Sequence, residues 1–193
     1  WDQFVINSEE ELKKSWADQP SALDIGFGAG ETTACMARNN PEMLVLGAEV
    51  YLAGIGSLLN KADTESLENI KILNADIAPF LEEKVANNCF DLILMFYPDP
   101  WPKRKHHKRR LFQKDFVNLV NKKLKPNGIF YFKTDWSHYF DHAKKLLLHN
   151  PAWKVLEKKD LEEYLQNLPQ TSFEKKALKA QRELNELILK KIK

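Results

Sequence analysis

Residues 21–31 read Ser-Ala-Leu-Asp-Ile-Gly-Phe-Gly-Ala-Gly-Glu, and this stretch decides the fold that we expect for the chain. The segment 21–26 is a short apolar run that ends at a glycine, which is typical of a buried strand. The segment 31–39 has a helical pattern that stops before Pro41. The glycines between them allow a tight turn and let a ligand approach the backbone closely. The stretch therefore predicts a strand, a ligand-binding turn and a helix.

The same alternation of apolar runs and helical patterns continues along the chain. We expect further strands at 43–50, 69–74, 90–97, 129–134 and 153–158, helices at 52–62, 79–86, 111–124 and 136–149, and a turn at 125–128. Repeated strand–helix units predict a parallel sheet with right-handed crossovers, which is a doubly wound α/β fold. The sequence contains no internal repeat and no linker, so we expect a single domain over residues 1–193.

The two ends of the chain are less regular. Near the start, the segment 9–16 has the pattern of a short amphipathic helix with Ser8 as its cap. Near the end, the segment 173–181 predicts a helix. The apolar residues from Leu184 to Ile192 fit either a continuation of that helix or a last strand, and we favour the strand.

Composition excludes several classes of protein. Hydrophobic residues make up 44% of the chain and aromatic residues 11%, which is too much for a disordered segment. No apolar run approaches the ~20 residues that a membrane helix needs. Two cysteines are too few for a disulfide framework or a four-thiolate metal site. By default we expect a cytoplasmic domain without a membrane segment, and nothing in the sequence requires a protein partner.

Charge is divided unequally between the two halves of the chain. Residues 1–98 carry 6 Lys or Arg against 16 Asp or Glu, whereas residues 99–193 carry 23 against 11. The formal net charge of +2 therefore hides an acidic half and a basic half. A basic surface can serve solubility alone, but a difference of this size favours a polyanionic partner for the second half.

The glycine loop points to a positively charged ligand. A dinucleotide-binding fingerprint would place its third glycine at position 31, where this chain has Glu31. A carboxylate at a helix N-terminus suits the helix dipole but not a neighbouring pyrophosphate. Two more acids lie at the ends of predicted strands: Glu49 is placed to accept from both ribose hydroxyls, and Asp76 is placed to accept from an exocyclic amine. Each of them can also be an ordinary surface acid.

The stretch 97–111, which reads Tyr-Pro-Asp-Pro-Trp-Pro-Lys-Arg-Lys-His-His-Lys-Arg-Arg-Leu, begins where the fourth strand is expected to end. Its prolines stiffen the loop, and Trp101 or Tyr97 can stack on a splayed base. Its cations suit RNA phosphates, and we assign that contact to Lys105, Lys108, Arg109 and Arg110. Because six cations surround His106 and His107, we expect no metal there.

These residues resemble those of a broad class of enzymes and, more closely, those of one family within it. The acids at three strand ends resemble the pocket of class I S-adenosylmethionine-dependent methyltransferases. The motif Pro98-Asp-Pro-Trp101 with Lys103 and His107-Lys-Arg-Arg110 resembles the signature of bacterial tRNA (guanine-N7)-methyltransferases. The glycine loop, Thr134-Asp-Trp136 and Thr171-Ser-Phe-Glu174 agree with that family in the same order.

The resemblance implies a Rossmann-like, mostly parallel sheet of seven strands whose last strand is antiparallel. It implies methyl transfer from S-adenosyl-L-methionine to N7 of guanine 46 in tRNA. The reaction would be a direct in-line displacement, with Asp99 as the catalytic residue. The implied cofactor contacts are Asp24, Gly26, Gly28, Gly30, Glu49, Asp76 and Asp99. The implied substrate contacts are Lys103, Asp135, Thr171, Ser172, Phe173 and Glu174.

The chain departs from the family at three places, and other functions stay open. Asp24 stands where Glu is frequent, Ala177 and Gln181 stand where glycines are common, and residues 1–20 lack a basic arm. Asp135 can instead cap the helix that follows it, and Thr171 with Glu174 fits a capping box. The alternative functions are methylation of another RNA base, non-catalytic RNA binding and a nicotinamide-dependent oxidoreductase.

Overall fold

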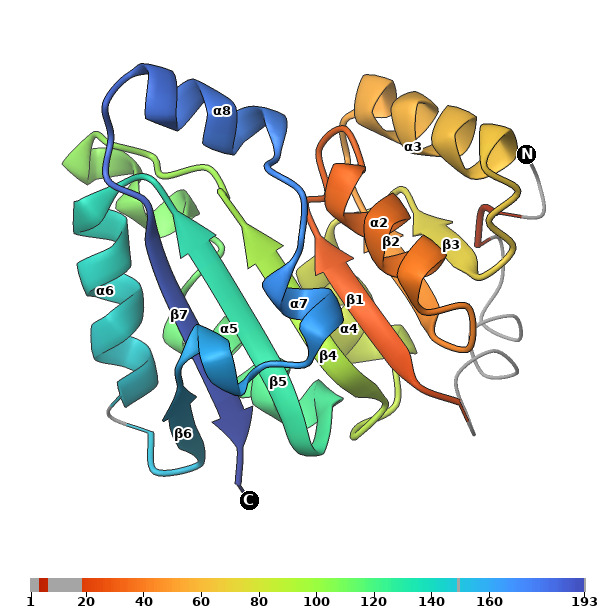
Figure 1. Ribbon diagram of the computed structural model, residues 1–193. Coiled ribbons are helices and arrows are strands. Elements are labelled where there is room, and N and C mark those ends of the chain that lie inside the picture. The colour runs from red at the N-terminus through yellow and green to blue at the C-terminus, as the bar shows by residue number, and fades with distance from the viewer. Residues whose placement is uncertain (1–3, 7–18, 149, 193) are drawn as a thin grey trace.

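The structure is a computed structural model that describes residues 4–6, 19–148 and 150–192. Seven strands form one sheet in the order β3-β2-β1-β4-β5-β7-β6, as Figure 1 shows. The strands are β1 (Ser21–Ile25), β2 (Leu44–Ala48), β3 (Ile70–Leu73), β4 (Phe90–Phe96), β5 (Leu124–Thr134), β6 (Trp153–Leu156) and β7 (Asn185–Lys191). Strands β1 to β5 pair in parallel, and β7 pairs antiparallel with both β5 and β6. The predicted doubly wound α/β sheet with an antiparallel last strand is confirmed.

Helices cover both faces of the sheet, and β1, β2 and β4 are accordingly buried on both sides. On one face pack α2 (Glu31–Asn39), α3 (Leu52–Thr64) and α7 (Glu163–Gln166). On the other face pack α4 (Ile77–Lys84), α5 (Lys114–Lys123) and α6 (Ser137–Leu148). Two short 3-10 helices, η1 (Arg104–Arg109) and η2 (Lys158–Asp160), lie in connections. The last helix, α8 (Ser172–Lys179), lies above the arrowheads of the parallel strands in Figure 1.

The strand order reverses between β1 and β4. From β1 the chain winds outward through β2 to β3 and then returns to β4 on the other side of β1. In open α/β sheets ligands bind at this reversal, beyond the carboxyl ends of the strands. The glycine loop after β1 and the Pro98–Pro102 loop after β4 both start there.

The final strand resolves the ambiguity at the C-terminal end. Strand β7 pairs with the carboxyl-terminal half of β5, from Thr134 opposite Asn185 to Ile129 opposite Lys190. The prediction of a strand after Gln181 is therefore confirmed. At the other end, Phe4–Ile6 lies beside β3, where Ile6 N–H donates to Ile72 O at 3.0 Å. The helix expected at 9–16 lies outside the described residues.

The turn expected at 125–128 is wrong as a strand boundary, because β5 already begins at Leu124. The segment is instead an irregularity inside the strand: Phe90 pairs with Leu124 and Leu92 with Ile129, so the intervening residues bulge. Asn127 has a φ of 68°, which explains the turn-like composition.

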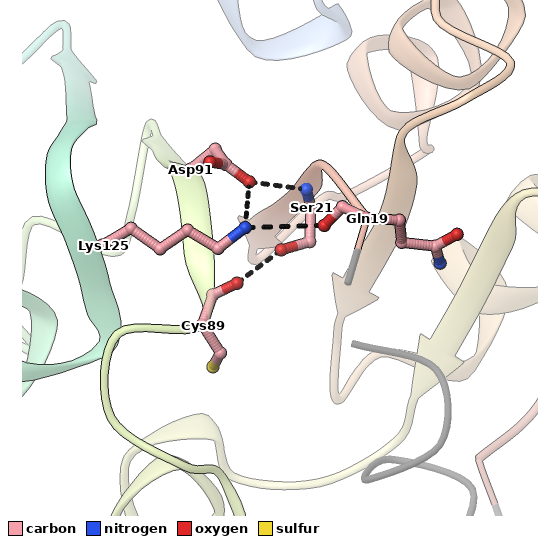
Figure 2. A network of polar contacts seen from close by, with 5 residues as sticks. All are labelled: Gln19, Ser21, Cys89, Asp91 and Lys125. Atoms are coloured by element: carbon pink, nitrogen blue, oxygen red, sulfur yellow. Dashed lines mark hydrogen bonds and ion pairs between the residues drawn. The ribbon is translucent and has the colours of Figure 1, made fainter. Parts of the chain in front are cut away.

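The bulge serves a polar network at the amino-terminal end of the strands, shown in Figure 2. One oxygen of Asp91 accepts from Lys125 Nζ at 2.7 Å and from Ser21 N–H at 2.9 Å. Ser21 Oγ donates to the carbonyl oxygen of Cys89 at 2.5 Å. The network ties the start of β1 to β4 and β5.

Among the described helices, none combines the length and apolarity required to cross a bilayer.

Candidate functional site

A cavity of about 870 Å³ opens at the carboxyl ends of β1, β2 and β4, where the strand order reverses. Strand ends and their loops form its floor, and α8 contributes Ser172, Phe173 and Lys176. The residues predicted from the sequence that line this cavity are Gly26, Gly28, Glu49, Asp76, Tyr97, Asp99, Trp101, Arg109, Ser172 and Phe173. The structure therefore brings together five of the seven predicted cofactor contacts. The other two, Asp24 at the end of β1 and Gly30 at the start of α2, do not line the cavity.

The carboxylate of Glu49 fixes the glycine loop to the end of β2. Its Oε2 accepts from Gly28 N–H at 2.9 Å, and its Oε1 accepts from the N–H groups of Val50 and Tyr51 at 2.8 and 3.0 Å. A carboxylate offers about four lone-pair sites, so about one remains for a ligand in the cavity. Glu49 is thus a structural acceptor that keeps capacity for a further hydrogen bond.

Asp24 is buried beneath the loop. Its Oδ2 accepts from Thr33 Oγ1 of α2 at 2.7 Å, and only 2% of the residue is exposed. Burial raises the pKa of Asp24 to about 7; the Thr33 bond opposes that rise, and Glu49 and Glu31 add to it. Asp24 therefore ties the end of β1 to α2, and it does not line the cavity. A positively charged ligand nearby would favour its ionised form.

Gly30 is required by the backbone conformation at the start of α2. It caps α2 with a φ of 77°, and an added Cβ would lie 2.8 Å from Leu58 Cβ. A side chain here would be strained and would also clash with α3. The position therefore permits the sharp turn from the loop into α2 and the close packing of α3, whereas Gly26 and Gly28 line the cavity.

Asp76 has a double role. It is the N-cap of α4, where one carboxylate oxygen accepts from Ala78 N–H at 3.2 Å. This cap explains why α4 begins at Ile77 instead of the predicted position 79. Because Asp76 also lines the cavity, its second oxygen can accept from a ligand, as the sequence predicts.

Asp99 lies on a loop that is held in an unusual conformation. Tyr97 and Trp101, on either side of it, have left-handed φ values of 52° and 41°. Such values cost non-glycine residues about 1 kcal/mol or more and persist where the surroundings impose them. The Trp101 ring packs against His106 at 5.7 Å and under the Arg109 guanidinium at 5.0 Å between centres. The loop therefore presents Asp99 to the cavity from a constrained backbone.

Arg110 supplies much of that constraint, and its predicted role as a phosphate contact is wrong. The residue is 2% exposed. Its Nε donates to Pro100 O at 2.8 Å, its terminal nitrogens lie 3.3 Å from His138 Nδ1, and its guanidinium lies 4.8 Å over the Tyr139 ring. A guanidinium engaged on every side cannot reach RNA. Lys105, Lys108 and Arg109 remain exposed on η1, as does Lys103 before it.

The predicted substrate residues of α8 divide into two groups. Thr171 caps the helix by accepting from Glu174 N–H at 3.1 Å, which confirms the expected cap, while Ser172 and Phe173 face the cavity. The Glu174 carboxylate turns inward to Tyr97. Burial raises the pKa of Tyr97 above its ordinary range, and the charges of Glu174 and Asp135 act in the same direction. The Tyr97 hydroxyl therefore stays protonated beside Glu174.

Asp135 also has a partner already. Its Oδ2 accepts from Arg182 Nη1 at 2.7 Å. The side-chain bond at the start of α6 comes from its neighbour: Thr134 Oγ1 accepts from Trp136 N–H at 3.3 Å. Lys103, Asp135, Thr171 and Glu174 are thus near the site but do not line its cavity.

Among the lining residues that were not recognised from the sequence, three stand out. Val50 and Tyr51 are apolar yet 66% and 68% exposed at the edge of the cavity, and Lys176 lines it from α8. The signal for the first two is an apolar pair directly after a strand end, where a polar turn is usual. Lys176 had no distinguishing signal, because a lysine on a short helix is commonly solvated.

Comparison with known proteins identifies a family and a group of relatives. A family model described as putative methyltransferase matches residues 18–187. A tRNA (guanine-N(7)-)-methyltransferase of Pseudomonas putida (strain W619) is 42% identical over 137 residues, which is 71% of this chain and 57% of that protein. The protein of the same name from Nitrosococcus oceani is 44% identical over 134 residues, which is 69% of this chain and 57% of that protein. The chain thus spans somewhat more than half the length of these curated relatives.

Solved structures agree with the fold. The 16S rRNA methyltransferase KamB is similar with a TM-score of 0.67 at 15% identity, covering 96% of this chain and 94% of that chain. An rRNA methylase from Streptococcus thermophilus is similar with a TM-score of 0.60 at 12% identity, with the same coverage. At such identities the likeness concerns the fold alone, and it confirms the expected methyltransferase-like α/β architecture.

Proposed function

Because the chain belongs to the family of putative methyltransferases whose model it matches over residues 18–187, we propose that it transfers a methyl group from S-adenosyl-L-methionine to N7 of a guanine in tRNA. The names of the curated relatives support the reaction and the substrate class. We place the modified guanine at position 46, in the variable loop of tRNA, on the resemblance of the Pro98–Arg110 motif.

The cavity has the chemistry that the cofactor needs. Glu49, Asp76 and Asp99 line it together, so its carboxylates suit a ligand with a net positive centre. Val50, Ile77 and Leu111 give apolar wall for a flat base. The backbone at Gly26 leaves space, since an added Cβ there would meet no atom within 4 Å. When bound, S-adenosylmethionine supplies an electrophilic methyl group on a sulfonium sulfur.

The observation that carries this proposal is the placement of Asp99. It lies in the same cavity as Glu49 and Asp76, on the loop whose carbonyl at Pro100 is held by Arg110. Guanine N7 has a lone pair and no proton, so the reacting atom needs no general base. Asp99 therefore acts as a hydrogen-bond acceptor and not as a base: its carboxylate accepts hydrogen bonds from the N1–H and N2–H groups of guanine. There it orients the base and stabilises the positive charge that develops on the purine.

The basic half of the chain supports an RNA substrate. Lys103, Lys105, Lys108 and Arg109 are exposed on the segment that directly follows the Asp99 loop. Arg109 also lines the cavity, so the basic segment continues into the site without a break. Cations at the mouth of a cavity that takes a base are placed for the phosphates beside that base.

The test is to incubate the protein with unmodified tRNA and S-adenosylmethionine and to identify methylated nucleosides by mass spectrometry. We expect 7-methylguanosine, located at position 46 by fragment mapping. Detection of a different methylated nucleoside would show that the protein methylates another RNA base. Absence of any methylation, together with binding of NAD but not S-adenosylhomocysteine, would favour the oxidoreductase instead.

A further inference from the structure

Helix α8 distributes its charges unequally between its inner and outer sides. Ala177 is buried, Glu174 turns inward to Tyr97, and Ser172 and Phe173 face the cavity. The side chains left facing solvent include Lys175, Lys176 and Lys179, all of them exposed. Glu174, the one acid of the helix, is only partly exposed, whereas its lysines are exposed.

These three lysines, here called the α8 lysine face, are not neutralised by neighbouring acids. Within residues 4–6, 19–148 and 150–192, the ion pairs of the structure include none of them. Arg182, just beyond the helix, differs from them because it is paired with Asp135 at 2.7 Å. Three cations on an eight-residue helix repel one another, and a polyanion relieves that repulsion.

The α8 lysine face is continuous with the cavity. Lys176 lines it, and its Nζ lies 5.5 Å from the centre of the Phe173 ring, which also lines it. An added Cβ at Gly28 would lie 3.3 Å from Phe173, so the helix is seated directly on the glycine loop. A nucleotide whose base enters the cavity leaves its phosphates at the mouth, where Lys176 of α8 and Arg109 of η1 both line the cavity.

We propose that Lys175, Lys176 and Lys179 form a second RNA-backbone surface, which contacts phosphates flanking the nucleotide held in the cavity. This inference rests on the proposed function, because it assigns the same RNA to a surface separate from the 103–110 segment. It adds a binding role to a helix whose sequence otherwise reads as a solvated amphipathic segment.

The test compares two variants with the same change in charge. Lys175→Gln/Lys179→Gln removes two cations from the α8 lysine face, and Lys154→Gln/Lys190→Gln removes two cations from paired positions on β6 and β7, at the other end of the sheet. The dissociation constant for unmodified tRNA is measured over a range of KCl concentrations. Each lost phosphate contact reduces the salt slope by about 0.7 to 0.9. We expect the α8 variant to lose about 1.4 to 1.8 and to bind roughly tenfold more weakly at low salt.

The control variant should keep the wild-type slope, and both variants should keep wild-type affinity for S-adenosylhomocysteine. The charge-preserving Lys175→Arg/Lys179→Arg variant should also keep the slope, which separates lost contacts from a damaged helix. An unchanged slope in the α8 Gln variant, or an equal loss in the control, would overturn the RNA surface while leaving the proposed reaction intact. If the wild-type protein binds no tRNA, both the RNA surface and the proposed function are wrong.

Discussion

The Nε of Arg110 donates to the carbonyl oxygen of Pro100 at 2.8 Å, one residue beyond Asp99. A buried guanidinium thus holds the loop that carries the proposed catalytic carboxylate, and the Tyr139 ring beneath it and His138 beside it fix the guanidinium in turn. The run of cations that suggests RNA contact therefore ends in a residue that faces inward.

Replacing Arg110 by Lys should destabilise the protein by about 2 to 3 kcal/mol, because an ammonium cannot reproduce the fork and leaves buried acceptors unpaired. It should also lower kcat more than it raises KM, since the position of Asp99 loosens. Chemical denaturation and steady-state kinetics measure the two effects, and added guanidinium ion at low concentration should restore part of kcat. Arg104→Lys, on exposed η1, is the matched control and should change stability by less than about 0.5 kcal/mol. A purely structural Arg110 would show the stability loss without any rescue.

Replacing Asp99 by Ala should reduce methyl transfer by about 100-fold or more, because an oriented hydrogen-bond acceptor is lost from the base. Affinity for S-adenosylhomocysteine, measured by calorimetry, should stay within about tenfold, or roughly 1.4 kcal/mol. Asp141→Ala, an exposed acid on α6, controls for the change of charge. Turnover equal to wild type would remove Asp99 from the reaction.

Asp24 should make the stability of the protein depend on pH. Its pKa is raised to about 7 in the folded state from 3.8, so the unfolded chain releases this proton at lower pH than the folded protein does. Between these values the folded state binds more protons, and its stability falls as pH rises. Asp24→Asn cannot ionise, so its stability relative to wild type should rise between pH 4 and 7, by up to about 1.4 kcal/mol per pH unit. Urea denaturation of both proteins at pH 4.5 and 8 measures this, and a constant difference between them would contradict the raised pKa.

Replacing Gln181 by Gly should stabilise the protein by about 0.5 to 1 kcal/mol. Gln181 has a φ of 53° directly after α8, where its N–H donates to Leu178 O and the N–H of Arg182 donates to Ala177 O. This is the Schellman arrangement, whose left-handed position favours glycine. Ala180→Gly, at a right-handed φ of −86°, should instead be neutral or destabilising. Thermal unfolding of the two variants distinguishes them, and equal shifts would show that the left-handed conformation carries no strain.

Periodicity predicted most elements because buried parallel strands leave a local signature of continuous apolar runs. It failed at 125–128, where Pro, Asn and Gly have turn chemistry but lie in a bulge whose pairing partner, Phe90, is distant in sequence. The site residues that could be predicted are those at the carboxyl ends of strands, because these ends meet at one edge of the sheet. Glu49, Asp76 and Asp99 belong to this group. The inward direction of Arg110 and the position of Asp24 beneath the loop depend on Tyr139 and Thr33, which only tertiary packing brings close.

The place of β7 between β5 and β6 has a consequence for the order of assembly during synthesis. β6 precedes β7 in the chain but pairs with the sheet through it, so β6 cannot join when it first leaves the ribosome. The strands from β1 to β5 can form their parallel sheet earlier, as amino-terminal segments generally do. The segment that covers the cavity, α8, lies between β6 and β7 in sequence. The strand ends that carry the acids of the cavity therefore form first. The helix with the lysines, α8, is fixed in place only when β7 has paired with β5.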